Sequence, residues 1–242
     1  MRVLVLSDIH ANLEAFQAVL AAAGAVDALW CLGDVVGYGP DPNECVNLLF
    51  EQADLRCLRG NHDAAAVGDL PLDSFNPEAR SSMEWQRAAL DAASIAKLKS
   101  QDTRLELGEV TLVHASPRQP VLEYLLDTQA AGDNFAYFES PFCFVGHTHI
   151  PVHFALNGER RQPSMRIPKP NHQFTLEARS IINPGSVGQP RDRDPRAAFA
   201  IFDTTAHTWD YRRVSYDVAA VQAKMRAQGL PKRHIERIAS GW

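Results

Sequence analysis

Long hydrophobic runs are absent from this 242-residue sequence. No apolar run approaches the ~20 residues that a membrane-spanning helix needs. The N-terminus has the wrong form for a signal peptide, because Met1-Arg2 is followed by a short apolar run that already ends in polar residues at Asp8. We therefore expect a cytoplasmic protein that makes no contact with membranes.

Cysteine is scarce as well, and its spacing excludes one class of site. The four cysteines are Cys31, Cys45, Cys57 and Cys143, and no two of them form a C-x-x-C pair. A zinc–cysteine site is therefore not expected. Three of the four lie within short apolar runs, where a thiol behaves as a small hydrophobic side chain. The pattern favours reduced cysteines in the core of a cytosolic protein.

Basic charge is not in excess. The formal net charge is −5, so the electropositive surface typical of nucleic-acid-binding proteins is not predicted. No internal repeat and no long linker divides the chain, and 45% of its residues are hydrophobic, enough for a sizeable core. We expect one domain over residues 1–242, with a metal-ligand core in 1–150 and the remaining strands of a second sheet plus a C-terminal helix in 151–242.

What the sequence does contain is a repeated strand ending. Five short apolar runs each end in Asp, Asn or His, and they occupy residues 3–10, 29–34, 55–62, 110–114 and 142–149. Runs of this kind are typical of buried parallel strands. Ligands of open α/β sheets bind beyond the carboxyl ends of the strands. We therefore expect these polar ends to meet in one crevice, with Asp34 at its centre.

The rest of the chain supplies helices and further strands. Predicted helices cover residues 12–23, 42–49, 64–100, 128–138 and 216–228, and a basic tail follows to Trp242. Further predicted strands cover residues 104–107, 152–156, 173–176, 180–183, 197–203 and 208–213. Asn157-Gly158 predicts a hairpin turn, and residues 159–170 predict an exposed polar excursion. Two packed mixed sheets with flanking helices fit this order.

Seven residues at the strand ends are candidate metal ligands. They are Asp8, His10, Asp34, Asn61, His114, His147 and His149. Carboxylate and imidazole ligands without thiolate suit Mn, Fe, Zn or Ni. Seven ligands are too many for one ion but suit two ions that share a bridging Asp34. Two such ions hold a hydroxide between them and clamp a phosphoryl group.

Simpler explanations exist for single members of this set. An Asp or His where a strand meets a helix is often a turn former or a helix cap, but this does not account for seven such residues together. Asp63 suits a helix cap as well as an orienting partner of His62. Among the other histidines, His153 is expected to be structural, because it lies in an alternating strand. Polar surroundings place the remaining three at the surface: His172, His207 and His234.

These motifs together resemble the calcineurin-like metallophosphoesterase superfamily, in its small bacterial and archaeal phosphodiesterase and phosphatase branch. The resemblance is carried by Asp8-x-His10, Gly33-Asp34, Gly60-Asn61-His62-Asp63, His114 and Gly146-His147-x-His149, with Asn183-Pro184-Gly185-Ser186 as a further strand end. It implies a four-layer αββα sandwich, of the α+β or α/β class, with two mixed sheets flanked by helices. It also implies two divalent metal ions, with Mn as the leading choice.

The resemblance also assigns roles to residues. It implies one ion bound by Asp8, His10, Asp34 and His149, and a second ion bound by Asp34, Asn61, His114 and His147. It places His62 beside the leaving group, where His62 acts as a general acid or as a donor to the phosphoryl oxygens. Asn61, His62 and Asp63 are accordingly the candidate catalytic residues.

The chain departs from the serine/threonine protein phosphatases of this superfamily in two places. Residues 35–39 contain neither the Asp nor the Arg found there, and Asp63 stands in place of Glu. A dedicated protein-phosphatase role is therefore not favoured. Replacement cations for binding phosphate are Arg118, Arg191 and Arg193, with Arg191 preferred because its loop follows the strand ending at Asn183. Tyr38 and Asn12 flank the site in sequence and are candidate substrate contacts.

The sequence thus predicts a dinuclear metal-dependent phosphoesterase. A metal-bridging hydroxide would attack the phosphorus of a small-molecule phosphate monoester or diester, with nucleotides among the candidates, and His62 would protonate the leaving oxygen. The alternative of another class is a non-catalytic metal-binding scaffold for a protein partner, although such a protein would be expected to lose His62 or a ligand. A nuclease is disfavoured by the acidic charge and small size. The oligomeric state is left open.

Overall fold

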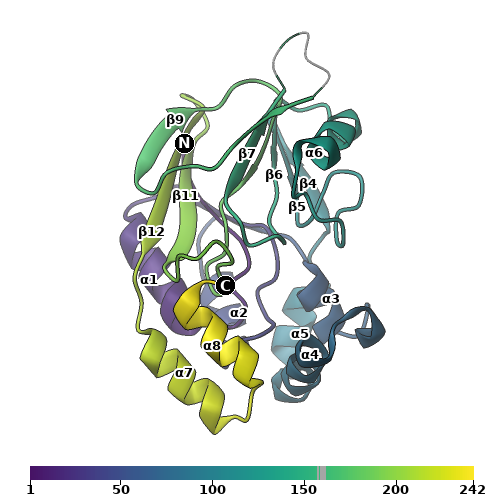
Figure 1. The fold of residues 1–242 in the computed structure, drawn as a ribbon, viewed down its shortest axis with the longest axis vertical. Coiled ribbons are helices and arrows are strands. Elements are labelled where there is room, and N and C mark those ends of the chain that lie inside the picture. The colour runs from purple at the N-terminus through teal and green to yellow at the C-terminus, as the bar shows by residue number, and fades with distance from the viewer. Residues whose placement is uncertain (157, 159–161) are drawn as a thin grey trace.

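The computed structural model describes residues 1–156, 158 and 162–242. Asn157, from the predicted hairpin turn, and residues 159–161, from the predicted polar excursion, lie outside the described residues. The chain forms two six-stranded sheets that pack face to face, with helices on their outer sides (Figure 1). Both sheets are mixed, because each contains parallel and antiparallel neighbours.

The strand order brings distant parts of the chain together. The first sheet has the order β3 (Leu55–Cys57), β2 (Ala28–Cys31), β1 (Arg2–Leu6), β11 (Ala197–Asp203), β12 (Thr208–Val214) and β9 (His172–Thr175). The second has the order β4 (Arg104–Leu107), β5 (Val110–Val113), β6 (Phe142–Phe144), β10 (Ser180–Asn183), β7 (Val152–Ala155) and β8 (Ser164–Arg166). Both sheets thus contain strands from the two halves of the chain.

Helices join these strands and cover the sheets. In chain order they are α1 (Leu13–Ala23), α2 (Pro42–Phe50), α3 (Asn61–Ala66), the 3₁₀ turn η1 (Leu72–Ser74), α4 (Pro77–Ala89), α5 (Ala92–Lys99), α6 (Thr128–Asn134), the 3₁₀ turn η2 (Phe135–Tyr137), α7 (Val218–Ala227) and α8 (Lys232–Ser240). None of these helices combines the length and the apolarity needed to cross a bilayer.

Alternation along the strands divides the core into layers. In β1, Leu4 and Leu6 pack against α1, whereas Val3 and Val5 face the second sheet. A strand buried on both faces shows this period of two, and each fully buried side chain contributes roughly 1.5–3 kcal/mol. A third cluster, which includes Phe135, packs the α6–η2 segment on the outer face of the second sheet. These layers confirm the predicted four-layer αββα sandwich.

The parallel strands position the site. β1, β2 and β3 run parallel in the first sheet, and β5, β6 and β10 run parallel in the second. Their carboxyl ends carry the polar strand endings of the sequence and meet at one end of the sandwich (Figure 1). Because this end draws on residues from both halves of the chain, we propose that residues 1–242 form one domain.

The predicted sheet assignment of the second half was wrong in part. We expected residues 151–242 to complete the second sheet, but β9, β11 and β12 belong to the first sheet. β11 pairs antiparallel with β1, and β12 pairs with β11 and β9. The sequence pattern identifies a strand by its own alternation of buried residues, whereas sheet membership depends on which neighbour completes its hydrogen bonds.

Helix boundaries differ from the predicted ones where caps and 3₁₀ turns intervene. The predicted helical stretch 64–100 is divided into α3, η1, α4 and α5. The caps are Asn76 and Asp91, whose side chains accept hydrogen bonds from the N–H of Ala79 and Ser94 at 3.0 and 2.7 Å. The helix expected over residues 128–138 ends at Asn134 and tightens into η2, as helix ends often do.

The four cysteines match their predicted environment. All of them are buried, and none forms a disulfide. Burial raises the pKa of the Cys143 thiol, which keeps this group neutral and unreactive. The cysteines therefore act as packing residues.

His234 corrects a prediction about the C-terminal tail. The residues after α7 form the helix α8, and His234 on this helix is only 2% exposed instead of lying at the surface. Its ring centroid lies 4.6 Å from that of Tyr38. His172, in contrast, is exposed as expected. The sequence around His234 is polar because only one face of the short α8 helix is buried.

Burial of His234 predicts a dependence of stability on pH. Burial lowers the pKa of His234 to about 4, below its ordinary value of 6.5. The neutral form therefore adds stability above pH 6.5, and this stability is lost as the pH falls toward 4. His147 and His153, also with pKa values of about 4, act in the same direction. In His234→Leu, the free energy of unfolding should fall less between pH 7 and pH 4.5, by a few kcal/mol at most.

Urea unfolding of metal-free protein at the two pH values measures this difference. The matched control is His172→Leu, which removes an exposed histidine and should keep the pH dependence of the unchanged protein. If His234→Leu lost as much stability on acidification as the unchanged protein, His234 would not be a buried neutral imidazole.

Candidate metal centre

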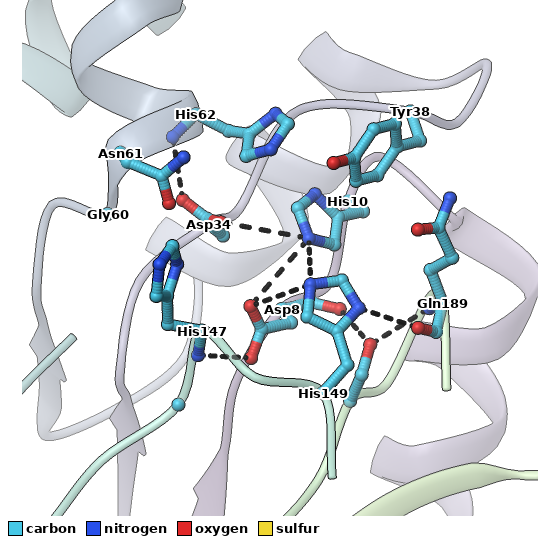
Figure 2. Close-up of polar contacts among 12 residues, drawn as sticks. Asp8, His10, Asp34, Tyr38, Gly60, Asn61, His62, His147, His149 and Gln189 are labelled. Carbon is cyan, nitrogen blue, oxygen red and sulfur yellow. Dashed lines mark hydrogen bonds and ion pairs between the residues drawn. The ribbon is translucent and has the colours of Figure 1, made fainter. Parts of the chain in front are cut away.

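The polar strand ends meet at the carboxyl edge of both sheets, as Figure 2 shows. Three ends come from the first sheet and carry Asp8 and His10, Asp34, and Asn61 with His62. Two ends come from the second sheet and carry His114, and His147 with His149. Each of the seven candidate ligands is at most 6% exposed. The structure therefore brings all seven together, as the sequence predicts.

The backbone at these strand ends is bent in an uncommon way. Asp8, His10, Asp34, His147 and His149 have φ angles of 57°, 49°, 54°, 64° and 62°. A non-glycine residue in this left-handed region costs roughly 1–2 kcal/mol, and such residues cluster at functional sites. Residues two apart already share one face of an extended strand, so the members of the pairs 8/10 and 147/149 start on the same side. The left-handed bends then turn the chain away after each strand while these side chains stay at its end.

Two glycines allow neighbouring strand ends to approach closely. A Cβ atom at Gly60 would overlap Oδ1 of Asp34, and one at Gly146 would overlap Oγ of Ser7 and approach Asp8. Only glycine leaves room at these points. The glycine before Asn61 and the glycine before His147 are therefore part of the site geometry and are not simply turn formers.

One group of candidate ligands consists of Asp8, His10 and His149. Nε2 of His10 lies 3.0 Å from Nε2 of His149, and Oδ1 of Asp8 lies 3.7 and 3.3 Å from these two atoms. The Nδ1 atoms donate to the carbonyl oxygens of Val36 and Gln189 at 3.1 and 2.6 Å. Each Nε2 therefore carries a lone pair, and two lone pairs facing each other at this distance repel unless a cation lies between them.

A second group consists of Asp34, His114 and His147, and His62 lies close to His10 and Asp34 in a third, overlapping group. Nε2 of His114 lies 3.3 Å from Oδ2 of Asp34 and 3.1 Å from Oδ1 of Asn61. Its Nδ1 donates to the carbonyl oxygen of Leu32 at 2.8 Å, which again leaves Nε2 free to bind a metal. Oδ2 of Asp34 is also 3.7 Å from Nε2 of His10, so Asp34 lies between the two groups.

Unpaired buried atoms show that these residues fit metal ions. Oδ1 of Asp8, Oδ2 of Asp34 and Nε2 of His147 are buried and have no hydrogen-bond partner among the described residues. Leaving such atoms unpaired costs free energy. The two carboxylate oxygens face the ring nitrogens of their groups, His147 belongs to the second group, and oxygen and imidazole donors suit divalent transition metals. The donor set therefore fits two ions that share Asp34.

Electrostatics keep most of these ligands ready to bind a cation. Burial lowers the pKa of His147 to about 4, and it lowers the pKa of His149 well below the ordinary value. Burial alone would raise the pKa of Asp34, but the neighbouring His114, His62 and His10 hold it below the ordinary value. Asp34 in turn raises the pKa of His114 to about 9 against the effect of burial. In metal-free protein a proton on His114 thus compensates the buried carboxylate.

The role of Asp63 is decided by its hydrogen bonds. Its two carboxylate oxygens accept from the backbone N–H of Val36 and Gly60, both within 3.1 Å. Asp63 therefore caps α3 and ties the loop after Asp34 to this helix. It does not orient the His62 ring, whose Nδ1 lies 3.1 Å from Sδ of Met83. The backbone N–H of His62 donates to Oδ1 of Asp34 at 2.8 Å.

The predicted substrate contacts divide into two groups. Tyr38 and Arg191 meet at the site, where Nη2 of Arg191 donates to the Tyr38 hydroxyl at 3.3 Å. Asn12 does not serve the site, because it caps α1 and donates to the carbonyl oxygen of Gly188 at 3.0 Å. Arg118 pairs with Glu123, and Arg193 lies over the Trp242 ring at 4.8 Å. Of the three arginines, Arg191 is the one that meets Tyr38 at the site.

A small cleft of about 220 Å³ opens beside the second ligand group. Its inner end is formed by Asn61, His62 and His147, and its walls include Tyr38, Phe75, Leu122 and Tyr124. Sequence reasoning missed Phe75, Leu122, Tyr124 and the supporting Gln189, because they lie on loops whose path the motifs do not determine.

A larger cavity of about 600 Å³ near Trp30 and His207 contains none of the candidate ligands.

Known proteins resemble this chain over its length. The calcineurin-like phosphoesterase superfamily domain matches residues 1–207. A metallophosphoesterase from Sphaerobacter thermophilus is 44% identical, with a TM-score of 0.91 over 100% of this chain and 99% of that one. The uncharacterized protein MJ0912 of Methanocaldococcus jannaschii is 35% identical over 98% of this chain and 97% of its own. The hypothetical protein PH1004 of Pyrococcus horikoshii OT3 shares the fold, with a TM-score of 0.82, 19% identity and coverage of 100% and 98%.

Proposed function

Because the chain belongs to the calcineurin-like phosphoesterase superfamily, we propose that it hydrolyses phosphate monoesters or diesters of small molecules with two divalent metal ions. The observation that supports this proposal best is the pair of facing Nε2 atoms of His10 and His149, 3.0 Å apart beside the unpaired Oδ1 of Asp8. The same arrangement of unpaired donors recurs at Asp34 and His147. A cation at each place would pair these atoms.

The ligand sets follow from the two groups. Asp8, His10, Asp34 and His149 would hold one ion, and Asp34, Asn61, His114 and His147 would hold the other. We propose Mn as the metal, with Fe, Zn and Ni as alternatives that the same donors accept. Two bound ions would lower the pKa of water from 15.7 to near 7 and balance the charge of a phosphoryl group.

The chain's own residues then bind and orient the substrate. His62 lies at the inner end of the cleft, where its ring is 4.8 Å from the ring of His10. From this position it would donate a proton to the leaving oxygen or hydrogen-bond a phosphoryl oxygen. Burial lowers the pKa of His62 in the metal-free protein. A negatively charged phosphoryl group beside the ring would act in the opposite direction and favour the protonated imidazole.

Arg191 would supply the positive charge that residues 35–39 lack. Its guanidinium donates to Tyr38 and to Oε1 of Gln189 at 3.1 Å, and its buried Nε has no partner among the described residues. An arginine with a free N–H beside a metal pair suits a phosphoryl oxygen. The Tyr38 ring lies 4.5 Å from His62, so the arginine reaches the same side of the cleft as the proposed proton donor.

The size of the cleft and the state of the cysteines support two further proposals. About 220 Å³ is below the ~300–1,000 Å³ of sites for drug-sized ligands, which favours a small-molecule substrate over a protein or a nucleic acid. The four buried, unpaired cysteines favour a cytoplasmic location, where thiols stay reduced.

The test is a matched pair of hydrolysis assays. Protein loaded with Mn²⁺ is given a chromogenic phosphate monoester and the corresponding diester, and both assays are repeated after chelation. We expect turnover that disappears with the chelator and returns with added metal, and the preferred ester distinguishes a phosphatase from a phosphodiesterase. Two bound ions without turnover of either ester would contradict the proposal and support the non-catalytic scaffold.

A further inference from the structure

The cleft beside the second ligand group has walls made of aromatic rings. Tyr38 and Phe75 both contact His62, with ring centroids 4.5 and 5.0 Å from that of His62. Tyr124 lies against His147, with centroids 4.0 Å apart and the two ring planes 33° from each other. Figure 2 shows the rings of Tyr38 and His62 side by side above His10. The proposed metal binding and proton transfer explain why histidines lie here. They do not explain Phe75 or Tyr124.

The mouth of the cleft exposes apolar side chains. Leu122 and Tyr124 follow β5 and are 47% and 49% exposed, although both are large and apolar. Large exposed apolar side chains at a concave site often mark a binding surface. Both line the cleft, so a ligand there would cover them and gain their contact area.

Polar groups in the same walls provide a means of orienting a ligand. The Asn76 side chain uses Oδ1 to accept from the N–H of Ala79 at 3.0 Å as the cap of α4. Asn76 lines the cleft, and this cap leaves its amide Nδ2 available as a donor. The Ser74 hydroxyl, also in the wall, donates to the carbonyl oxygen of Pro71 and keeps its acceptor capacity. Such a combination of rings and a few fixed polar atoms suits a planar heterocycle.

We propose that this cleft binds one planar heteroaromatic ring of the substrate, which makes the substrate class a mononucleotide ester and not an aliphatic phosphoester. The proposal rests on the proposed function, because the ring would lie next to the phosphoryl group held at Asn61, His62 and His147. Since the ring lies on the His62 side, the oxygen that bears the nucleoside is the leaving group. A volume of about 220 Å³ accepts one ring system but not a second nucleoside.

Paired probes test the ring preference directly. The non-hydrolysable methylene phosphonate analogues of adenosine monophosphate and of ribose 5-phosphate share the phosphoryl end and differ in the base. Calorimetry on Mn²⁺-loaded protein should show that the adenosine analogue binds roughly tenfold tighter, the effect of one base–aromatic stack. The variants Tyr124→Leu and Phe75→Leu each remove a ring but keep apolar volume. Each should reduce this binding ratio toward one.

The matched control is Tyr137→Leu. Tyr137 is 48% exposed, almost the same as Tyr124, but it lies on η2 and is not among the residues that line the cleft. This variant should keep the full binding ratio. Thermal unfolding of all variants checks that the fold is retained, which is expected for half-exposed positions.

The outcomes separate this inference from the proposed function. Equal affinity for the two probes, or no binding of either, would overturn the inference even if phosphoesters are hydrolysed. A ratio that persists in Tyr124→Leu and Phe75→Leu would also overturn it, because the ring would bind elsewhere. Preferential binding of the adenosine analogue that depends on these rings, with no turnover of any phosphoester, would support the inference and contradict the proposed function.

Discussion

Asp34→Asn is expected to lower kcat/KM for phosphoester hydrolysis by at least about 100–1,000-fold and to reduce the metal content from two ions toward one. Asp34 is fully buried, and its Oδ2 lies 3.3 Å from His114 and 3.7 Å from His10, so it is the carboxylate that faces both ligand groups. An amide of the same shape removes the negative charge that two cations would share. The measurements are steady-state kinetics and metal analysis on the purified variant.

The control for Asp34→Asn is Asp63→Asn. Asp63 is equally buried and directly follows His62 in the chain. Its carboxylate oxygens, however, accept hydrogen bonds from the backbone N–H groups of Val36 and Gly60. Its replacement should cost stability through the α3 cap, typically about 1 kcal/mol, and leave both ions bound. If Asp34→Asn kept full hydrolysis after its metals were stripped, a metal-dependent mechanism would be wrong.

The meeting of the candidate metal ligands could be predicted from sequence because it depends on local features. Each of these residues follows an apolar run. The carboxyl ends of parallel strands meet at one edge of a sheet, whatever the order of the strands in that sheet. Asp, Asn and His also tolerate the left-handed backbone that these ends adopt. The resemblance that these motifs carry is confirmed by the match to the calcineurin-like superfamily domain over residues 1–207.

Roles that depend on distant partners could not be predicted. Asn12 follows the Asp8-x-His10 motif in sequence and was expected to contact substrate, but Gly188, from the far end of the chain, takes its amide. From the sequence, Asp63 could equally cap the following helix or orient His62. The structure shows that it accepts a hydrogen bond from the backbone N–H of Val36. In both cases a backbone group with no sequence signature competes for the side chain, and the backbone group has the stronger need for a partner.

The position of Tyr38 and Arg191 likewise depends on contacts made late in the chain. Residues 208–242 lie beyond the part that matches the family domain. Nζ of Lys224 on α7 lies 2.9 Å from Oδ2 of Asp41, at the end of the loop that carries Tyr38. The N–H of Arg193 donates to the carbonyl oxygen of Gly241 at 2.7 Å, which ties the Arg191 loop to the end of α8. The strand-end motifs supply the candidate metal ligands, whereas α7 and α8 hold the loops that carry Tyr38 and Arg191.

His62→Asn is expected to lower kcat by roughly 100–10,000-fold, the range for loss of a general acid, and to leave the metal content unchanged. His62 is 4% exposed and lies at the inner end of the cleft, and its hydrogen bond to Asp34 is made by its backbone N–H. An asparagine keeps that backbone contact and a hydrogen-bond donor but cannot transfer a proton. The loss should therefore depend on the leaving group.

Kinetics with a series of aryl and alkyl esters separates the two roles proposed for His62. A good leaving group departs as an anion without a proton, whereas a poor one needs the proton in the transition state. The loss in His62→Asn should thus be largest for alkyl esters and much smaller for nitrophenyl esters. Met83→Leu, which removes only the sulfur 3.1 Å from Nδ1, serves as the control and should change kcat little. An equal loss for every ester would mean that His62 binds the phosphoryl oxygens and does not protonate the leaving group.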